Sequence, residues 1–300
     1  MPNTLQSEPP CLVCEKRKFQ EVFEGRIIGN HALKRCKNCG MVQAFAVDGV
    51  SSFDYADYGD YLLLSDAEIQ RRVRSVSQTM RPVFKMLGKR CNVAKVLDVG
   101  SGAGYFCKAA EEFGLNAFGV ELSDKLIEFC KEKVGFQRVF KQIEEIDTQF
   151  DAIFMSDVIE HLPPGKSRQI MSNLVDHLKP NGLFIGNTPN FRSANILICK
   201  DKDPVVAPPS HMCYFSPKTL DRYLSSVGFA RVRLYTQGLS SNSFFRKSKF
   251  ERSFLEKSLR GASLPALPFL VTLRMMFATA GYLLQPFGLG YQIYFVYRKK

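Results

Sequence analysis

The stretch from Val96 to Phe106, VLDVGSGAGYF, constrains the fold more than any other part of the chain. Its apolar first half predicts a buried strand, and the residues after the turn predict a helix. Between them, glycines at positions 100, 102 and 104 let the backbone turn sharply and approach a ligand with no Cβ in the way. The first N–H groups of the helix point into the same turn. This strand–turn–helix unit predicts a cradle for a nucleotide-like ligand.

The chain continues this unit with an acidic residue, Glu121, 21 positions after Gly100. An acid at the end of the second strand of a βαβ unit binds ribose hydroxyls. Two ligands then compete, a dinucleotide and S-adenosylmethionine. The dinucleotide fingerprint requires glycine at position 105, where this chain has Tyr105. Asp98, directly before the loop, suits an ammonium group and would repel a pyrophosphate, which favours S-adenosylmethionine.

The glycine-rich stretch resembles motif I of the class I S-adenosylmethionine-dependent methyltransferases. Two later segments, FDAIFMSDVIEHL from Phe150 and LKPNGLFIGNTPN from Leu178, resemble the segments that follow motif I in this class. The residues around His211 and the following SPKTL resemble a segment of its small-molecule members. The resemblance covers about 95–235 and, loosely, 291–300. It implies an α/β fold, a doubly wound Rossmann-like sheet with helices on both faces.

The resemblance also implies which residues hold the cofactor. The methionine end would lie against Asp98 and the loop, and Glu121 would bind the ribose. Leu122 would lie against the adenine, Gln142 and Ile143 would meet its amine side, and the end of the fourth strand would flank the ligand. The full predicted set is Asp98, Gly100, Ser101, Gly102, Gly104, Glu121, Leu122, Gln142, Ile143, Ser156 and Asp157.

The predicted catalytic residues are Glu160, His161 and His211. Glu160 and His161 follow the fourth strand at the mouth of the sheet, where ligands bind in such folds. Either histidine could act as a general base toward a hydroxyl acceptor. A purely structural role for His161 stays open. Asp157, Glu160, His161 and His211 also resemble a magnesium-binding set of some RNA and quinone O-methyltransferases, and Mg²⁺ is the less favoured interpretation.

Four cysteines near the N-terminus, Cys11, Cys14, Cys36 and Cys39, follow the spacing C-x2-C-x21-C-x2-C. Two such knuckles predict a tetrahedral zinc site, and the alternating residues between them predict a β-hairpin, as in a zinc ribbon. Zn²⁺ is expected to be structural, since so small a module has little core of its own. The nine cysteines do not suggest a disulfide framework, and with no visible signal peptide we expect a cytoplasmic protein.

These features divide the chain into five parts. We expect a zinc ribbon at 1–45, a linker and lead-in helix at 46–92, the cofactor-binding domain at 93–240, a basic and apolar extension at 241–289, and a final strand at 290–300. The linker carries Tyr55, Tyr58 and Tyr61 at three-residue spacing. These tyrosines either pack against the domain or form a lid over the ligand.

The positive charge is concentrated near the C-terminus. The formal net charge is +12, and from Arg231 to Lys300 there are 12 Lys and Arg residues against two Glu. Basic residues at 246–260 precede a nearly uncharged stretch at 261–289. Three interpretations stay open: a helical hairpin over the substrate pocket, a peripheral anchor on a membrane surface, or a true membrane span.

The sequence therefore predicts an S-adenosylmethionine-dependent methyltransferase with a small-molecule acceptor. We expect O-methylation of a sugar or a lipid-linked glycan intermediate. An RNA end is the second candidate acceptor, but aromatic and basic residues do not alternate as they do in strand-binding grooves, which argues against a nucleic acid partner. The intact loop and Glu121 disfavour a non-catalytic cofactor-binding module, and Tyr105 and Asp98 disfavour a dehydrogenase.

Overall fold

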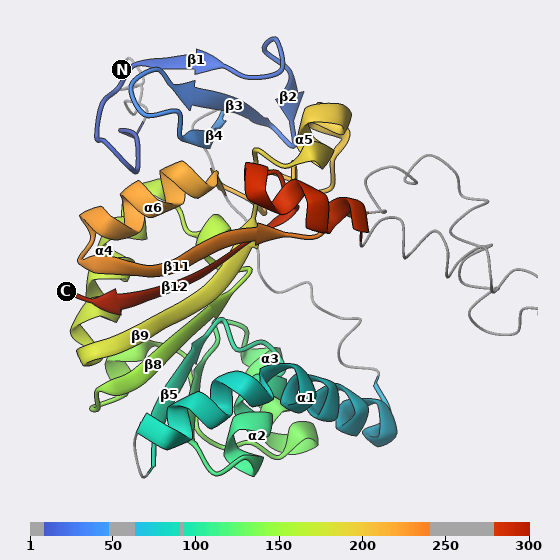
Figure 1. Cartoon of the computed structure of the whole chain (residues 1–300), viewed down its shortest axis with the longest axis vertical. Helices are drawn as coiled ribbons and strands as arrows, with labels where there is room; N and C mark the ends of the chain where they lie inside the picture. Colours follow the sequence, from blue (N-terminus) through green and yellow to red (C-terminus); the bar gives the residue numbers. More distant parts are fainter. Residues whose placement is uncertain (1–8, 48–63, 91–92, 241–278) are drawn as a thin grey trace, which may run out of the picture.

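The fold contains a large sheet and, above it, a small N-terminal sheet (Figure 1). The computed structural model describes residues 9–47, 64–90, 93–240 and 279–300. The three linker tyrosines and the basic residues at 246–260 lie outside these ranges.

The large sheet has seven strands in the order β11-β12-β9-β8-β5-β6-β7. Six strands point in the same direction, and β12, which lies between β9 and β11, runs antiparallel to both neighbours. Their bounds are β5 Lys95–Val99, β6 Asn116–Val120, β7 Val139–Phe140, β8 Phe150–Ser156, β9 Leu178–Pro189, β11 Phe229–Gln237 and β12 Gln292–Lys299. The central strands are largely apolar because helices cover both faces of the sheet. The predicted doubly wound α/β fold is confirmed.

Helices flank the large sheet on both faces. They are α1 Asp66–Arg90, α2 Tyr105–Glu112, α3 Asp124–Phe129 with a π-helical turn Cys130–Val134, α4 Pro164–Asp176, α5 Ala194–Cys199 and α6 Pro217–Ser226. One core joins α1 and α2 to β5, β6 and β8, with the ring of Phe106 5.4 Å from that of Phe84 and 4.5 Å from that of Phe154. The other core joins α4 and α6 to the opposite face. Short 3-10 helices lie at Ile143–Glu145, Ile159–His161, Lys200–Lys202 and Gln285–Phe287.

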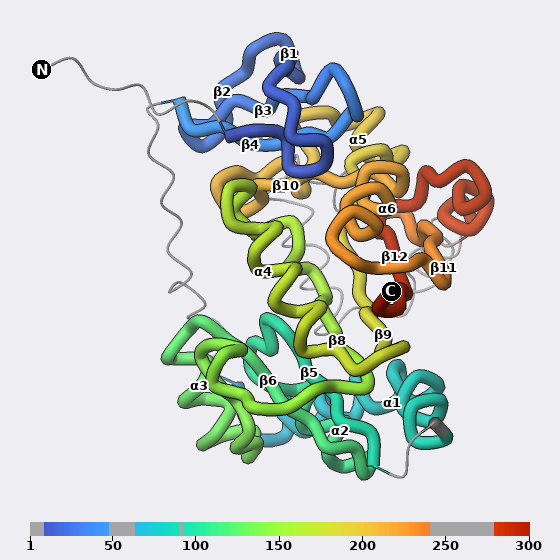
Figure 2. The backbone as a smooth tube through the Cα atoms, turned by 90° about the vertical axis from the view of Figure 1, so that its left-hand side faces the viewer, coloured from blue at the N-terminus to red at the C-terminus, as the bar shows by residue number. Residues whose placement is uncertain are grey.

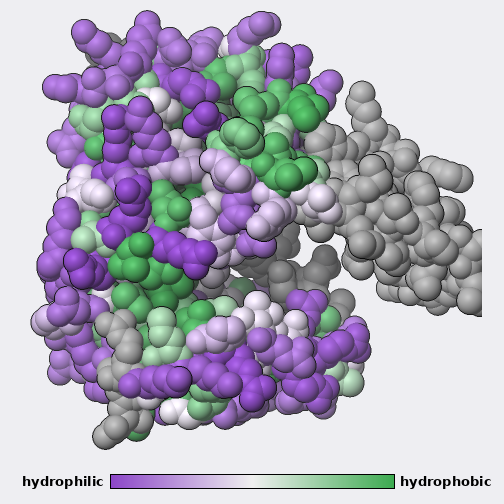
Figure 3. Space-filling view, in the orientation of Figure 1, coloured by the Kyte–Doolittle hydropathy of each residue, from purple (hydrophilic) through white to green (hydrophobic). Residues whose placement is uncertain are grey.

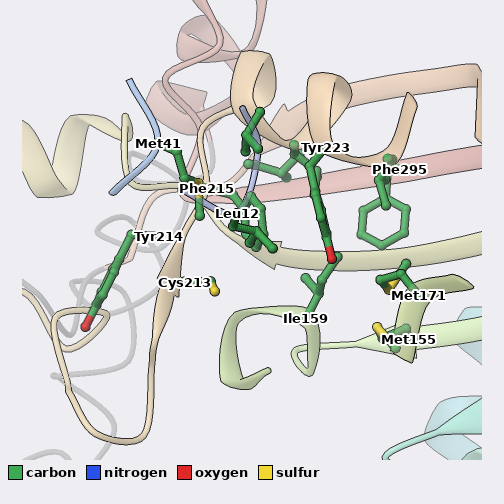
Figure 4. Close-up of a cluster of buried hydrophobic side chains, with 14 of the residues drawn as sticks. Leu12, Met41, Met155, Ile159, Met171, Cys213, Tyr214, Phe215, Tyr223 and Phe295 are labelled. Carbon is green, nitrogen blue, oxygen red and sulfur yellow. The ribbon is translucent and has the colours of Figure 1, made fainter. Parts of the chain in front are cut away.

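The small sheet is antiparallel and contains the predicted hairpin between the cysteine pairs. Its strands are β1 Phe19–Glu21, β2 Ile27–Ile28, β3 His31–Cys36 and β4 Val42–Ala46, and β4 also pairs with β10, Cys213–Tyr214. Figure 2 shows the blue N-terminal module packed over the segment that carries β10. In Figure 4, Leu12 and Met41 of this module lie beside Phe215 and Cys213, all within one buried cluster. The module and the large sheet therefore share a core.

Of the predicted C-terminal extension, the structure describes the last part. Residues 279–284 form a helix that continues into the 3-10 turn Gln285–Phe287. Across the described ranges, none of the helices has both the length and the apolar composition required to cross a bilayer. The residues that follow form β12, at the place predicted for the final strand.

Candidate functional site: a cofactor cavity beside a carboxylate–histidine cluster

The glycine loop joins β5 to α2 at the carboxyl end of the sheet. Gly100 has φ +72° and Gly104 has φ +77°, in the left-handed region that favours glycine. A Cβ at position 100 would lie 2.5 Å from Cγ2 of Val158, and one at position 104 would clash with Sγ of Cys130. The turn therefore needs glycine at both positions, for conformation and for space.

A cavity of about 460 Å³ opens beside this loop, a size typical of small-molecule sites. Ser101 Oγ is buried and has no hydrogen-bond partner among the described residues, so a polar ligand atom can satisfy it. Seven of the predicted site residues line the cavity: Gly100, Ser101, Gly102, Leu122, Ser156, Asp157 and His161.

Glu121 lies beneath the loop rather than on the cavity wall. It follows β6, is 9% exposed, and its Oε2 accepts the N–H of Gly102 at 2.8 Å. Its Oε1 accepts the N–H of Ser123 at 2.9 Å. Each carboxylate oxygen can accept more than one hydrogen bond, so ribose hydroxyls remain within its capacity. Glu121 fixes the loop even before a ligand arrives.

Asp98 is the last but one residue of β5 and is 8% exposed. Burial, with a smaller contribution from the negative charge of Glu121, raises the pKa of this carboxyl from 3.8 to about 8. A cationic group beside it would restore the charged form. The α-ammonium group of a methionine-like ligand would supply such a charge, but Asp98 is not among the residues that line the cavity, and its role stays a prediction.

Gln142 and Ile143, predicted on the adenine side, are not among the residues that line the cavity. The N–H of Gln142 bonds to Glu145 Oε1 at 2.8 Å as it caps the 3-10 helix that begins at Ile143. Ile143 is 9% exposed and belongs to the core.

Conversely, six residues that line the cavity were not predicted as site residues, and two of them carry polar side chains, Arg72 of α1 and Tyr105 of α2. The guanidinium of Arg72 lies 5.8 Å from the ring centroid of Tyr105. In the sequence, Tyr105 counted only against a dinucleotide. The Arg-rich face of the first long helix is the signal that could have found Arg72.

The three predicted catalytic residues come together at the cavity rim. One ligand atom from each of Glu160, His161 and His211 lies within 4.8 Å of the others. The imidazole rings are 4.8 Å apart, centroid to centroid. Nδ1 of His161 lies 2.6 Å from the carbonyl oxygen of Ser210, and Nδ1 of His211 lies 2.7 Å from that of Val205. Because a carbonyl only accepts, each Nδ1 is the donor in these two bonds, which in a neutral ring leaves the lone pair on Nε2. The His161 ring also interacts with the backbone of Asp157.

The environment keeps both rings neutral. Burial lowers the pKa of His161, and burial together with the neighbouring His161 lowers the pKa of His211 to about 4. Glu160 is 2% exposed, and burial together with Asp157 raises its pKa to about 8. Its Oε2 accepts from Thr188 Oγ1 at 2.9 Å, whereas Oε1 has no partner within the described part of the chain. One carboxylate and two imidazoles with an unsatisfied oxygen fit a divalent cation.

The four predicted zinc ligands also converge. Their Sγ atoms all lie within 4.8 Å of one another, with 3.4 Å between Cys11 and Cys39 and 3.5 Å between Cys14 and Cys36. A tetrahedron with Zn–S bonds of about 2.3 Å has sulfur atoms about 3.8 Å apart. The four thiols therefore fit a zinc ion with small adjustments.

Comparisons with known proteins agree with this site. A family model described as a methyltransferase domain matches residues 68–234. The ubiquinone biosynthesis O-methyltransferase of Rickettsia conorii (strain ATCC VR-613 / Malish 7) is 31% identical over 114 residues, 36% of this chain and 39% of the relative. The Rickettsia akari (strain Hartford) protein of the same name is 33% identical over 103 residues, 32% and 40% of the two chains. The chain thus spans about two fifths of the length of these curated relatives.

A solved structure, the S-adenosylmethionine-dependent methyltransferase from Archaeoglobus fulgidus, matches with a TM-score of 0.50 and 22% identity, covering 81% of this chain and all of that one. This likeness shows the fold. The family match spans more than half of the chain and contains the glycine loop, Glu121 and the Glu160–His161–His211 cluster. This match shows that the chain belongs to the methyltransferase domain family.

Proposed function

We propose that the enzyme acts on a small molecule and methylates a hydroxyl oxygen of one that is carried on a lipid. The observation that carries the proposal is the pair of neutral imidazoles beside a buried carboxylate, at the rim of the cofactor cavity. His161 lines that cavity, and its lone pair lies on Nε2 because Nδ1 donates to Ser210. A neutral imidazole of this tautomer suits a general base for a hydroxyl acceptor.

The chain's contribution to such a reaction is positioning and proton transfer. The bound cofactor supplies a methyl group on a sulfonium, open to in-line attack. Asp98 and the loop from Gly100 to Gly104 would hold its methionine end, and Glu121 its ribose. His161 would accept the hydroxyl proton at Nε2, and the ring of His211, 4.8 Å away, would orient it. Alignment of donor and acceptor supplies most of the rate gain in this chemistry.

The same three side chains support a second way to activate the acceptor hydroxyl. Glu160, His161 and His211 would hold a divalent cation such as Mg²⁺, which would lower the pKa of a bound hydroxyl. The unpartnered Oε1 of Glu160 favours this arrangement. Asp157 is less suited as a fourth ligand because its Oδ1 accepts from Gln292 Nε2 at 3.2 Å. Turnover that survives EDTA, with the zinc content measured in parallel, would reject the cation and leave the histidine base.

The acceptor class rests on two further observations. The curated relatives are named as O-methyltransferases of ubiquinone biosynthesis, which favours an oxygen acceptor on a quinone-type molecule over the sugar or lipid-linked glycan expected from the sequence. Exposed apolar side chains gather near α5 and the C-terminal helix (Figure 3). They are Ile27, Leu197, Ile198, Tyr282, Leu283 and Phe287. The N–H of Ala194 in α5 bonds to the carbonyl of Leu289 at 3.0 Å, which joins these segments into one face.

This face would rest on a membrane surface and bring the acceptor side toward lipid, on the cytoplasmic side. Large exposed apolar patches mark interaction sites more often than chance. Binding to vesicles of neutral and of anionic phospholipid, with and without added salt, tests the contact. The basic residues of the C-terminal third predict tighter binding to the anionic vesicles.

The acceptor itself is tested with methyl-labelled S-adenosylmethionine, the purified protein, and cell extract with membranes. The products are separated into organic, aqueous and acid-precipitable fractions. Label in the organic fraction supports a lipid-attached acceptor. Label in the aqueous fraction would indicate a free metabolite, and label in the precipitate would favour an RNA acceptor.

A further inference from the structure

The acceptor-side cluster is held by one short segment, residues 205–214. The carbonyls of Val205 and Ser210 accept from the two histidines and so fix their rings. At the other end of the segment, the N–H of Met212 bonds to the backbone carbonyl of Glu160 at 2.9 Å, and Sγ of Cys213 lies 3.3 Å from the carbonyl of Leu162. The segment therefore sets where both imidazoles stand relative to Glu160.

The N-terminal module holds this segment from the other side. Val42 pairs with Tyr214 and Gln43 with Cys213, and the N–H of Ala44 donates to the carbonyl of Met212 at 3.0 Å. Cys213 and Tyr214 are 1% and 3% exposed. The strand β10 is only two residues long, and in the described part of the chain β4 is its sole strand neighbour. Without β4, its buried backbone groups would lose their partners.

The position of β4 in turn depends on the first cysteine knuckle. The side chain of Gln43 is fully buried, and its Oε1 accepts the N–H of Leu12, between Cys11 and Cys14, at 2.8 Å. The carbonyl of the same Leu12 accepts from Nε of Arg168 in α4 at 3.0 Å. Nη2 of Arg168 donates to the carbonyl of Val13 at 3.1 Å. The knuckle is thus bonded both to β4 and to the helix that follows the catalytic cluster.

We infer that the zinc-bound module positions the catalytic cluster, and that Gln43 and Arg168 are its positioning residues. This inference rests on the proposed role of Glu160, His161 and His211. With strands of two to six residues, the module needs its metal to fold. Loss of zinc would release β4, then β10, and then the two histidines. Apart from His161, the residues that line the cofactor cavity are none of those released, so the rest of the cavity would keep its shape.

The test uses the full chain and three measurements: zinc content, hydrogen exchange of peptides, and S-adenosylhomocysteine binding, with methyl transfer as a fourth once an acceptor is known. The variants are Cys14→Ser, Gln43→Ala and Arg168→Gln. Gln20→Ala is the matched control, since Gln20 is exposed on β1 of the same module. Arg168→Lys keeps a cationic donor group, so its 205–214 amides should be better protected than those of Arg168→Gln. Arg168→Gln removes the contact from the methyltransferase side, so the module can still fold around its metal.

We expect each of the three variants to speed exchange of the 205–214 amides by about tenfold or more, with the 96–106 amides and cofactor binding unchanged. Methyl transfer should fall by about 100-fold, because a misplacement of about 1 Å costs that much. Slow exchange at 205–214 in all three variants would overturn the inference, as would purified protein without bound zinc. Hydrogen exchange and cofactor binding can be measured without an acceptor, so they test the inference independently of the proposed reaction. If the proposed reaction is wrong, the wild-type protein will transfer no methyl group even though its 205–214 amides are protected.

Discussion

The carboxylate of Glu121 accepts the backbone N–H of Gly102 at 2.8 Å, so one side chain connects the end of β6 to the glycine loop after β5. The residue that is predicted to bind the ribose therefore also shapes the turn that is predicted to bind the methionine end. If Glu121 binds the ribose as predicted, cofactor binding and loop geometry depend on the same carboxylate. Substitution of Glu121 should therefore disturb the loop as well as the contact with the ligand.

We expect Glu121→Ala to weaken binding of S-adenosylhomocysteine by at least about tenfold, since it removes hydrogen bonds to a charged group. Calorimetric titration measures the effect. Glu121→Gln should be milder because its amide oxygen can still accept from Gly102. An unchanged titration curve for Glu121→Ala would remove the ribose role.

Gly100→Ala should also lower cofactor affinity by about tenfold or more, because its Cβ would push Val158 out of the cavity wall. Gly135→Ala is the matched control. Gly135 has φ +74°, close to that of Gly100, but an added Cβ there meets no atom within 4 Å. Both variants carry the same backbone strain, and only Gly100→Ala should affect binding. Equal affinities for the two would place the loop outside the cofactor site.

Asp98 predicts a pH dependence of stability. Its folded pKa of about 8 is above the ordinary value of 3.8, so the native state binds more protons than the unfolded chain between these pH values. The ligand-free protein should therefore lose stability as pH rises through this window toward 8. Asp98→Asn cannot ionise and should remove this component, on the order of 3 kcal/mol between about pH 5.5 and 8.5. Urea unfolding at the two pH values measures it. If the free energy of unfolding changes equally between the two pH values in the wild type and in Asp98→Asn, the raised pKa of Asp98 is contradicted.

A general base at His161 predicts a selective loss of turnover. His161→Gln should reduce methyl transfer by about 100-fold or more, the usual contribution of such a base. Cofactor affinity should stay unchanged. His177→Gln is the control, since His177 caps α4 at its C-terminal end and its Nδ1 lies 2.9 Å from the carbonyl of Asn173 in the same helix. Full activity of His161→Gln would leave that histidine with a structural role.

Local patterns were enough to predict the fold and much of the cofactor cavity. The strand predicted directly before the glycine loop is β5, and the loop and the acid after β6 lie where the βαβ pattern puts them. The cysteine spacing likewise brought four sulfur atoms together. In both cases the sequence pattern and the site that it predicts belong to the same supersecondary unit, the βαβ unit or the cysteine module. The roles of the individual residues stay predictions.

Contacts between segments far apart in the chain could not be predicted from the sequence. The pairing of Gln43 with Cys213 joins residues 170 positions apart, and its two-residue strand has no periodicity to detect. Arg72 reaches the cavity only because α1 packs on α2. Gln142 was assigned from the resemblance alone, and the structure places it at the start of a 3-10 helix, outside the set of residues that line the cavity. Each outcome depends on tertiary packing, which a single sequence does not encode in a local pattern.

Transfer of a methyl group from S-adenosylmethionine to a hydroxyl oxygen is the reaction that all these residues would serve. The most direct measurement is to incubate the enzyme with methyl-labelled cofactor and a membrane extract, isolate the labelled product and treat it with hydriodic acid under conditions that cleave methyl ethers. We predict that the label leaves as volatile methyl iodide. Label that stays in the non-volatile product would mean methylation of carbon or nitrogen. Tight cofactor binding with no labelled product at all would mean that the chain binds the cofactor without using it.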